Sequence, residues 1–82
     1  MKQEKYEVAG FSFWTGGKFV AGEGYLGVAY ILAVPHLSEP LRPPYEVTTV
    51  KYYPLLKDAR DIARDFVTLL IQSGEMHRAI RR

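Results

Sequence analysis

The pattern of apolar and polar positions changes at Pro54. Before it, aromatic and β-branched residues alternate with polar ones and are interrupted by Gly and Pro, which is typical of short β-strands. After it, residues 57–73 place apolar side chains three and four positions apart, which is typical of an amphipathic helix. We therefore predict an α+β fold, in which a small antiparallel sheet of three to four strands packs on one C-terminal helix in the order β-β-β-α.

The first predicted strand covers residues 5–14. Its apolar positions change parity near Gly10, so we expect a β-bulge at that glycine. The next four residues, 15–18, contain two consecutive glycines, which can supply the positive φ angles of a tight hairpin turn. We therefore expect the chain to reverse there and a return strand to begin over residues 18–21.

Two further strands are predicted on either side of a proline-rich loop. Residues 25–34 are almost continuously apolar, which favours a central strand that is covered on both faces or leaves one face for a partner. Residues 35–44 hold four of the five prolines and should form an extended loop. Residues 45–53 carry aromatic side chains on both faces, which predicts an edge strand.

The helix is expected to bury one stripe of side chains against the sheet. At about 100° per residue, the stripe consists of Ala59, Ile62, Ala63, Phe66, Leu69 and Leu70. Val67 and Ile71 lie outside this stripe. We expect them to be covered either by residues 75–82, through Met76 and Ile80, or by another protein chain.

Composition limits the possible functions. The chain has 82 residues, so we expect a single domain over residues 1–82, with 48% hydrophobic residues, no Cys and two His. A domain of this size buries only roughly 60–65% of its unfolded surface, and it has neither a disulfide nor ligands for a zinc cage. The net charge is +2, and no apolar signal segment is visible at the N-terminus. We expect a soluble cytoplasmic protein, without a cofactor, metal or membrane contact.

Two short motifs resemble chemical sites but lack the context that their chemistry needs. Residues 22–27 match G-x-G-x-x-G, yet a strand rather than a phosphate-binding helix is expected after them. His36, Ser38 and Glu39 are the residue types of a hydrolytic triad, but neighbours in one loop rarely converge as a triad requires. We therefore predict no catalytic residues and no enzymatic activity.

The remaining signals point to binding. Exposed aromatic and Arg side chains often anchor protein interfaces, and apolar residues outside the core stripe suggest the same use. The predicted partner-binding residues are Trp14, Tyr52, Val67, Ile71, Arg78 and Arg81. We expect a non-catalytic protein-binding inhibitor, adaptor or assembly subunit, a kind of protein common in phages and mobile elements, in which a homodimer is one way to cover apolar surface. The alternative is a nucleic-acid binder that uses exposed aromatics and a basic C-terminus.

Overall fold

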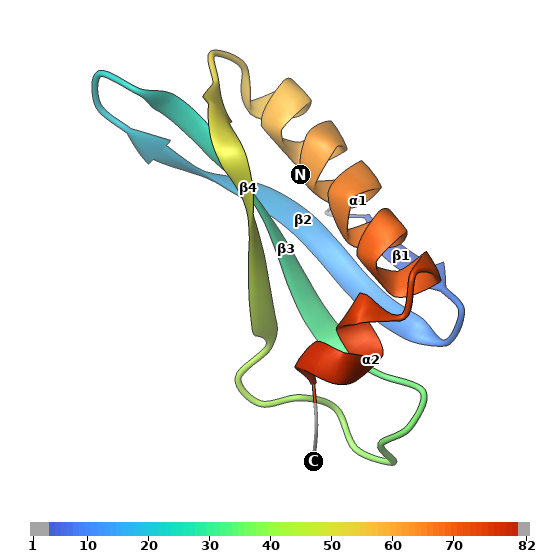
Figure 1. Ribbon diagram of the computed structural model, residues 1–82. Coiled ribbons are helices and arrows are strands. Elements are labelled where there is room, and N and C mark those ends of the chain that lie inside the picture. Colours follow the sequence, from blue (N-terminus) through green and yellow to red (C-terminus); the bar gives the residue numbers. More distant parts are fainter. Residues whose placement is uncertain (1–3, 81–82) are drawn as a thin grey trace.

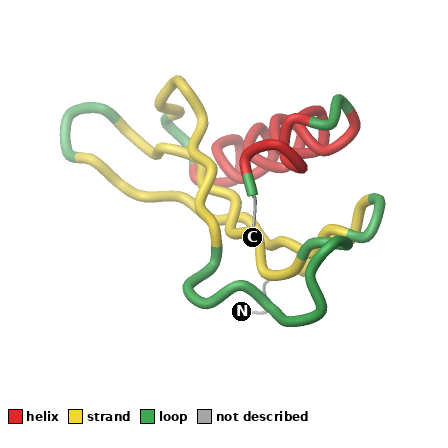
Figure 2. Tube along the Cα trace, turned by 60° about the horizontal axis from the view of Figure 1, so that its bottom comes forward, coloured by secondary structure: helices red, strands yellow, loops and turns green. Residues whose placement is uncertain are grey.

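The computed structural model describes residues 4–80 and contains a four-stranded antiparallel sheet in the spatial order β1-β2-β3-β4. Two helices follow and lie on the same face of the sheet (Figures 1 and 2). The predicted α+β class, antiparallel sheet and C-terminal helix are confirmed. The elements are β1 (Lys5–Val8), β2 (Phe11–Val20), β3 (Gly24–Ala33), β4 (Tyr45–Tyr53), α1 (Leu56–Gln72) and α2 (Glu75–Ala79).

The first hairpin differs from the prediction. Ala9 and Gly10 both have positive φ angles, 49° and 86°, and form a two-residue turn that brings Val8 opposite Phe11. This backbone twist suits the reversal of a tight hairpin. The parity change near Gly10 therefore comes from a chain reversal between two strands, and the predicted β-bulge in a single strand over residues 5–14 is wrong.

The predicted turn at residues 15–18 is also wrong, because these residues lie inside β2. The chain reverses later, over residues 21–23, where Gly22 has a φ of 85°. Gly17 is needed for packing instead. A Cβ atom at Gly17 would lie 2.6 Å from Cδ1 of Leu56, at the start of α1. Gly17 thus makes room beside the helix, and both glycines lie within an unbroken strand.

The pairing of β3 with β4 is interrupted at Gly27. Leu26 pairs with Tyr52 and Val28 pairs with Thr48, so residues 49–51 of β4 face the single residue Gly27. The Thr49 hydroxyl accepts a hydrogen bond from the Gly27 N–H at 3.0 Å and donates one to the Lys51 carbonyl oxygen at 2.9 Å. A side chain thereby replaces a missing backbone partner at a buried position.

Helix α1 lies close to the sheet at the same glycine. A Cβ atom at Gly27 would collide with the Ala59 carbonyl oxygen and would lie 2.8 Å from Cγ2 of Thr49. Ala59 and Ala63 are both buried on the helix face toward the sheet. Small residues on both elements therefore let the backbone of α1 lie almost directly on β3.

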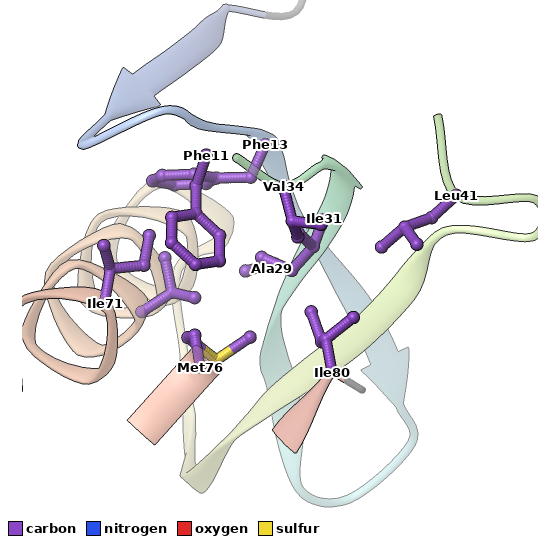
Figure 3. Close-up of a cluster of buried hydrophobic side chains, with 10 residues drawn as sticks. Phe11, Phe13, Ala29, Ile31, Val34, Leu41, Ile71, Met76 and Ile80 are labelled. Atoms are coloured by element: carbon purple, nitrogen blue, oxygen red, sulfur yellow. The ribbon is translucent and has the colours of Figure 1, made fainter. Parts of the chain in front are cut away.

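The main core lies between the sheet and both helices (Figure 3). Gly74 has a φ of 85° and ends α1, so that α2 turns back over the core. Figure 3 shows the Met76 and Ile80 side chains pointing into the cluster, as predicted. His36 holds the end of α2 in place, because its Nε2 atom donates a hydrogen bond to the Ile80 carbonyl oxygen at 2.8 Å. The buried cluster consists of Phe11, Phe13, Ala29, Ile31, Val34, Leu41, Val67, Ile71, Met76 and Ile80.

Neither helix has the length and apolar character that a membrane span requires, within the part of the chain that the structure describes.

We predict that Gly27→Ala destabilises the fold far more than Gly16→Ala. The added methyl group at Gly27 meets backbone atoms of α1 and should lower the free energy of unfolding by about 2–4 kcal/mol. At Gly16 the nearest atoms are ring carbons of Trp14 and Tyr30 at 3.5 and 3.7 Å, so the change should stay within about 1 kcal/mol. Urea unfolding followed by circular dichroism measures both values. Equal stabilities of the two variants would contradict the close contact.

We also predict that Thr49→Val lowers the free energy of unfolding by about 1–3 kcal/mol, because it leaves the buried Gly27 N–H without its acceptor. Thr48→Val is the matched control, since Thr48 is exposed and its replacement should change stability by less than about 0.5 kcal/mol. Amide hydrogen exchange at Gly27 is the second measurement. Unchanged protection of this amide in Thr49→Val would show that the hydroxyl is dispensable.

Candidate functional site

The sheet face opposite the helices has no second layer among the described residues. Its centre is formed by the side chains of Trp14 and Tyr30, which lie opposite each other on β2 and β3. Their rings are stacked, with centroids 4.1 Å apart and planes inclined by 22°. Tyr52 of β4 is exposed on the same face, opposite Leu26. Two of the predicted contact residues, Trp14 and Tyr52, therefore lie on one surface.

This face is partly covered by its own side chains. Lys18 of β2 and Glu46 of β4 form an ion pair of 3.0 Å that reaches across β3. Val28 lies between them in the register and is fully buried, although no helix packs on this side. The hydrogen bond to Glu46 raises the pKa of the Lys18 ammonium above its ordinary value. The strand over residues 25–34 thus needs no second protein layer to bury its central valine.

Val67 and Ile71 do not form a contact surface, so this prediction is wrong. Their side chains are 0% and 4% exposed and belong to the core beneath α2. Of the two coverings expected from the sequence, it is the C-terminal segment of the same chain that covers them. Ile62 and Leu69, which were predicted to lie in the core, are instead 39% and 64% exposed.

The helix is therefore rotated about its axis relative to the prediction. Its buried residues are Ala59, Ala63, Val67 and Ile71, one in every four. Contact with Gly27 of the sheet fixes the first end of this stripe, and packing against α2 fixes the other. A helical wheel includes neither the contact with Gly27 nor the packing against α2, because it uses only the hydrophobicity of the helix's own residues.

The rotation leaves a groove between β4 and α1. It is lined by Thr49, Val50, Lys51, Tyr53, Ile62 and Phe66, and we call it the β4–α1 groove. Val50 lies where β4 bulges from β3 and is 87% exposed, an extreme value for a valine in a strand. Strand β4 is an edge of the sheet, as predicted, so its outer side offers unpaired N–H and C=O groups along the same groove. Sequence reasoning missed Val50, Ile62 and Phe66 as surface residues.

Charged side chains of both signs lie around the groove and along α1, with Lys51 in the groove lining itself. Asp58 and Asp61 line a second depression beside the groove, together with Tyr53 and Ile62. The arginines lie on the far flank. Arg60 lines a depression at the β2 edge. Arg64 reaches the Tyr6 ring of β1, with its guanidinium carbon 6.0 Å from the ring centroid.

Ion pairs neutralise part of this charge. Asp61 is bonded to Lys57 at 3.1 Å and lies 3.7 Å from Arg64. The hydrogen bond from Arg64 to Asp65, at 3.1 Å, raises the pKa of Arg64. Asp58 has no ion-pair or hydrogen-bond partner among residues 4–80, and it lies in the depression beside the groove.

The other candidate residues are not brought into a site. Arg78 donates a hydrogen bond to Glu75 at 2.9 Å on the surface of α2, and Arg81 lies outside the described residues. His36 is bonded to Ile80, and no hydrogen bond within the described chain joins it to Ser38 or Glu39. The search of residues 4–80 found no group of three or more His, Cys, Asp or Glu side chains placed to hold a metal ion.

Comparisons with known proteins returned no match: no protein family, no curated protein and no solved structure matches this chain.

We predict that Ile71→Ala lowers the free energy of unfolding by about 2–5 kcal/mol, because it opens a cavity under α2. Leu69→Ala removes a side chain of similar size, two positions away, that is mostly exposed, so its effect should stay within about 0.5 kcal/mol. Thermal and urea unfolding of the two variants measures the difference. The opposite order of stabilities would mean that the helix faces the sheet as the wheel predicted.

Proposed function

We propose that this chain is a non-catalytic protein-binding module, acting as an inhibitor, adaptor or assembly subunit, and that its partner docks along β4 and the adjoining flank of α1. The observation that carries the proposal is the gathering of exposed apolar side chains on this flank. Val50, Ile62 and Leu69 are exposed there, next to the half-buried Phe66. Exposed apolar side chains that are scattered singly need no explanation, but a contiguous set beside a free strand edge suits an interface.

The β4 edge and the flank of α1 offer a partner two kinds of interaction. The edge offers hydrogen bonds to the backbone, which give affinity without demanding a particular sequence. The apolar side chains offer burial, and full burial of one Val or Leu side chain contributes roughly 1.5–3 kcal/mol. The core is already closed by α2 within this chain. The exposed flank therefore supports a role in docking rather than in completing the fold.

Nucleic-acid binding is the second candidate, and the aromatic face of the sheet is what favours it. Bases can stack on exposed aromatic rings of a four-stranded sheet. Here the Trp14 and Tyr30 rings already stack on each other, and Lys18 on the same face is paired with Glu46. Of the eleven basic side chains, Lys2, Arg81 and Arg82 lie outside the described residues. Protein binding is the better supported of the two, and a cytoplasmic location remains a prediction.

Photo-crosslinking distinguishes the two functions. We predict that a benzophenone amino acid placed at Val50 or at Leu69 captures protein partners in cells that naturally produce this chain. The same probe at Glu23, which is exposed in the β2–β3 turn, should capture none of them. Adducts are resolved by gel electrophoresis with and without nuclease. Adducts that disappear with nuclease, or equal capture of the same proteins from Glu23, would contradict docking of a protein at the flank.

A further inference from the structure

We propose that His36 and His77 together bind one divalent transition metal ion of the class that prefers imidazole ligands. His36 lies in the loop between β3 and β4, and His77 lies in α2, so the two residues are far apart in the sequence. Their rings lie side by side, with centroids 5.2 Å apart and planes inclined by 31°. The chain contains two His and no Cys, so all of its imidazoles meet at one place in the fold.

The separation of the two rings fits a shared metal ion. Imidazole nitrogens bind Zn²⁺ at about 2.0–2.1 Å, and a tetrahedral angle between two of them puts the ring centres roughly 5 Å apart. The centroids already lie 5.2 Å apart, so the backbones of the loop and of α2 need no rearrangement. His77 is exposed, and rotation about its own side-chain bonds presents a ring nitrogen to the ion.

One hydrogen bond prepares His36 as a ligand. Its Nε2 atom lies 2.8 Å from the Ile80 carbonyl oxygen. A carbonyl oxygen only accepts hydrogen bonds, so Nε2 carries the proton and the neutral ring keeps its lone pair on Nδ1. Histidines that bind metal ions commonly donate their other N–H to a backbone carbonyl or a carboxylate, which fixes the tautomer and the orientation of the ring. His36 already has this arrangement.

The surroundings of His77 suit the same role. Its ring meets the Phe11 ring edge to face, with centroids 5.0 Å apart, so it lies over the end of the core that α2 closes. The adjacent Arg78 donates a hydrogen bond to Glu75 at 2.9 Å. This cationic neighbour is therefore paired with a carboxylate, which lessens its repulsion of an incoming metal ion.

Two protein ligands define the kind of ion and the strength of binding. No third His, Cys, Asp or Glu joins the pair among residues 4–80, so water takes the remaining coordination positions. Zn²⁺, Ni²⁺ and Cu²⁺ accept imidazole nitrogen, whereas Mg²⁺ and Ca²⁺ prefer oxygen ligands. We therefore expect selective binding of the first group, but weaker binding than in structural zinc sites with four protein ligands.

A bound ion would join α2 to the β3–β4 loop. Helix α2 is followed by Ile80, which is buried in the core together with Met76, and His36 bonds to the Ile80 carbonyl oxygen. The ion adds a second link between the same two segments. The unfolded chain does not hold the two rings together, so binding of the ion stabilises the folded state.

Isothermal titration calorimetry of the whole chain with zinc chloride tests the proposal. We expect one Zn²⁺ ion per chain and no binding of Mg²⁺ at the same concentration. His77→Ala and His36→Ala each leave a single imidazole, so each should weaken Zn²⁺ binding at least about tenfold, because two linked ligands gain from effective concentration. Glu39→Gln is the matched control in the same loop and should leave the affinity unchanged, because its carboxylate belongs to no metal-binding group among residues 4–80.

Stability of the α2 end is the second measurement. At about 1 mM Zn²⁺ the thermal midpoint should rise by at least about 4 °C, and amide exchange in α2 should slow. His77→Ala should lose both effects and remain folded, because its ring is exposed. Circular dichroism verifies the fold of each variant.

The proposal is overturned if no heat of binding is detected with Zn²⁺, if His77→Ala binds Zn²⁺ as tightly as the unaltered chain, or if Mg²⁺ raises the midpoint equally. It is also overturned if light scattering shows that Zn²⁺ binds only by joining two chains, because the pair within one chain is then not the site. None of these outcomes bears on docking at β4 and α1, which photo-crosslinking from Val50 tests separately.

Discussion

The hydrogen bond from the Gly27 N–H to the Thr49 hydroxyl is the contact on which the arrangement of sheet and helix depends. It lets β4 carry a bulge without leaving a buried donor unpaired. The absence of a side chain at Gly27 lets Ala59 of α1 lie directly on the sheet. One residue thus joins three elements, through its N–H group and through its lack of a side chain. A larger residue would keep the hydrogen bond but push the helix away.

This contact decides which side of α1 remains exposed. With Ala59 and Ala63 against the sheet and Ile71 beneath α2, the stripe through Ile62 and Leu69 must turn toward the β4 edge. The bulge, in which the Thr49 hydroxyl bonds to Gly27 and Lys51, also contains Val50. Val50 is the most exposed large apolar side chain among those described. The groove that we assign to binding is therefore a direct consequence of how the core is packed.

The sequence predicted the elements whose signals are local. The Pro54 boundary, the edge strand over residues 45–53 and the helix after it follow from periodicity and turn residues, and all three are present. The inward positions of Met76 and Ile80 were also correct, because they follow from helical spacing after Gly74. The errors concern long-range choices. Gly17 in β2 makes room for Leu56, and nothing in residues 15–18 distinguishes that use from a turn.

The candidate site was only partly predictable for the same reason. Trp14 and Tyr52 were assigned to a surface, and they do lie on the open face of the sheet. The prediction placed Ile62 and Leu69 in the core and Val67 and Ile71 outside it, whereas the structure shows the reverse. All four are apolar residues on one helix, so only the neighbouring elements decide which pair is buried. The signal that distinguishes them is the spacing of Ala59 and Ala63 by one helical turn, together with a glycine in the central strand, which favours close approach of helix and sheet.

Part of the apolar surface that the composition suggests would need a partner is covered within this chain. Val28 is fully buried although it lies on the open sheet face, and α2 buries the far end of α1. Of the apolar side chains that stay exposed, Val50, Ile62 and Leu69 lie beside the bulged edge strand, while Phe19 and Leu55 are exposed elsewhere, in β2 and just before α1. A bulged edge resists pairing with long regular strands while its apolar groove still favours a partner that fits beside α1. The bulge in β4 therefore disfavours pairing with long regular strands and limits which segments can bind at this edge.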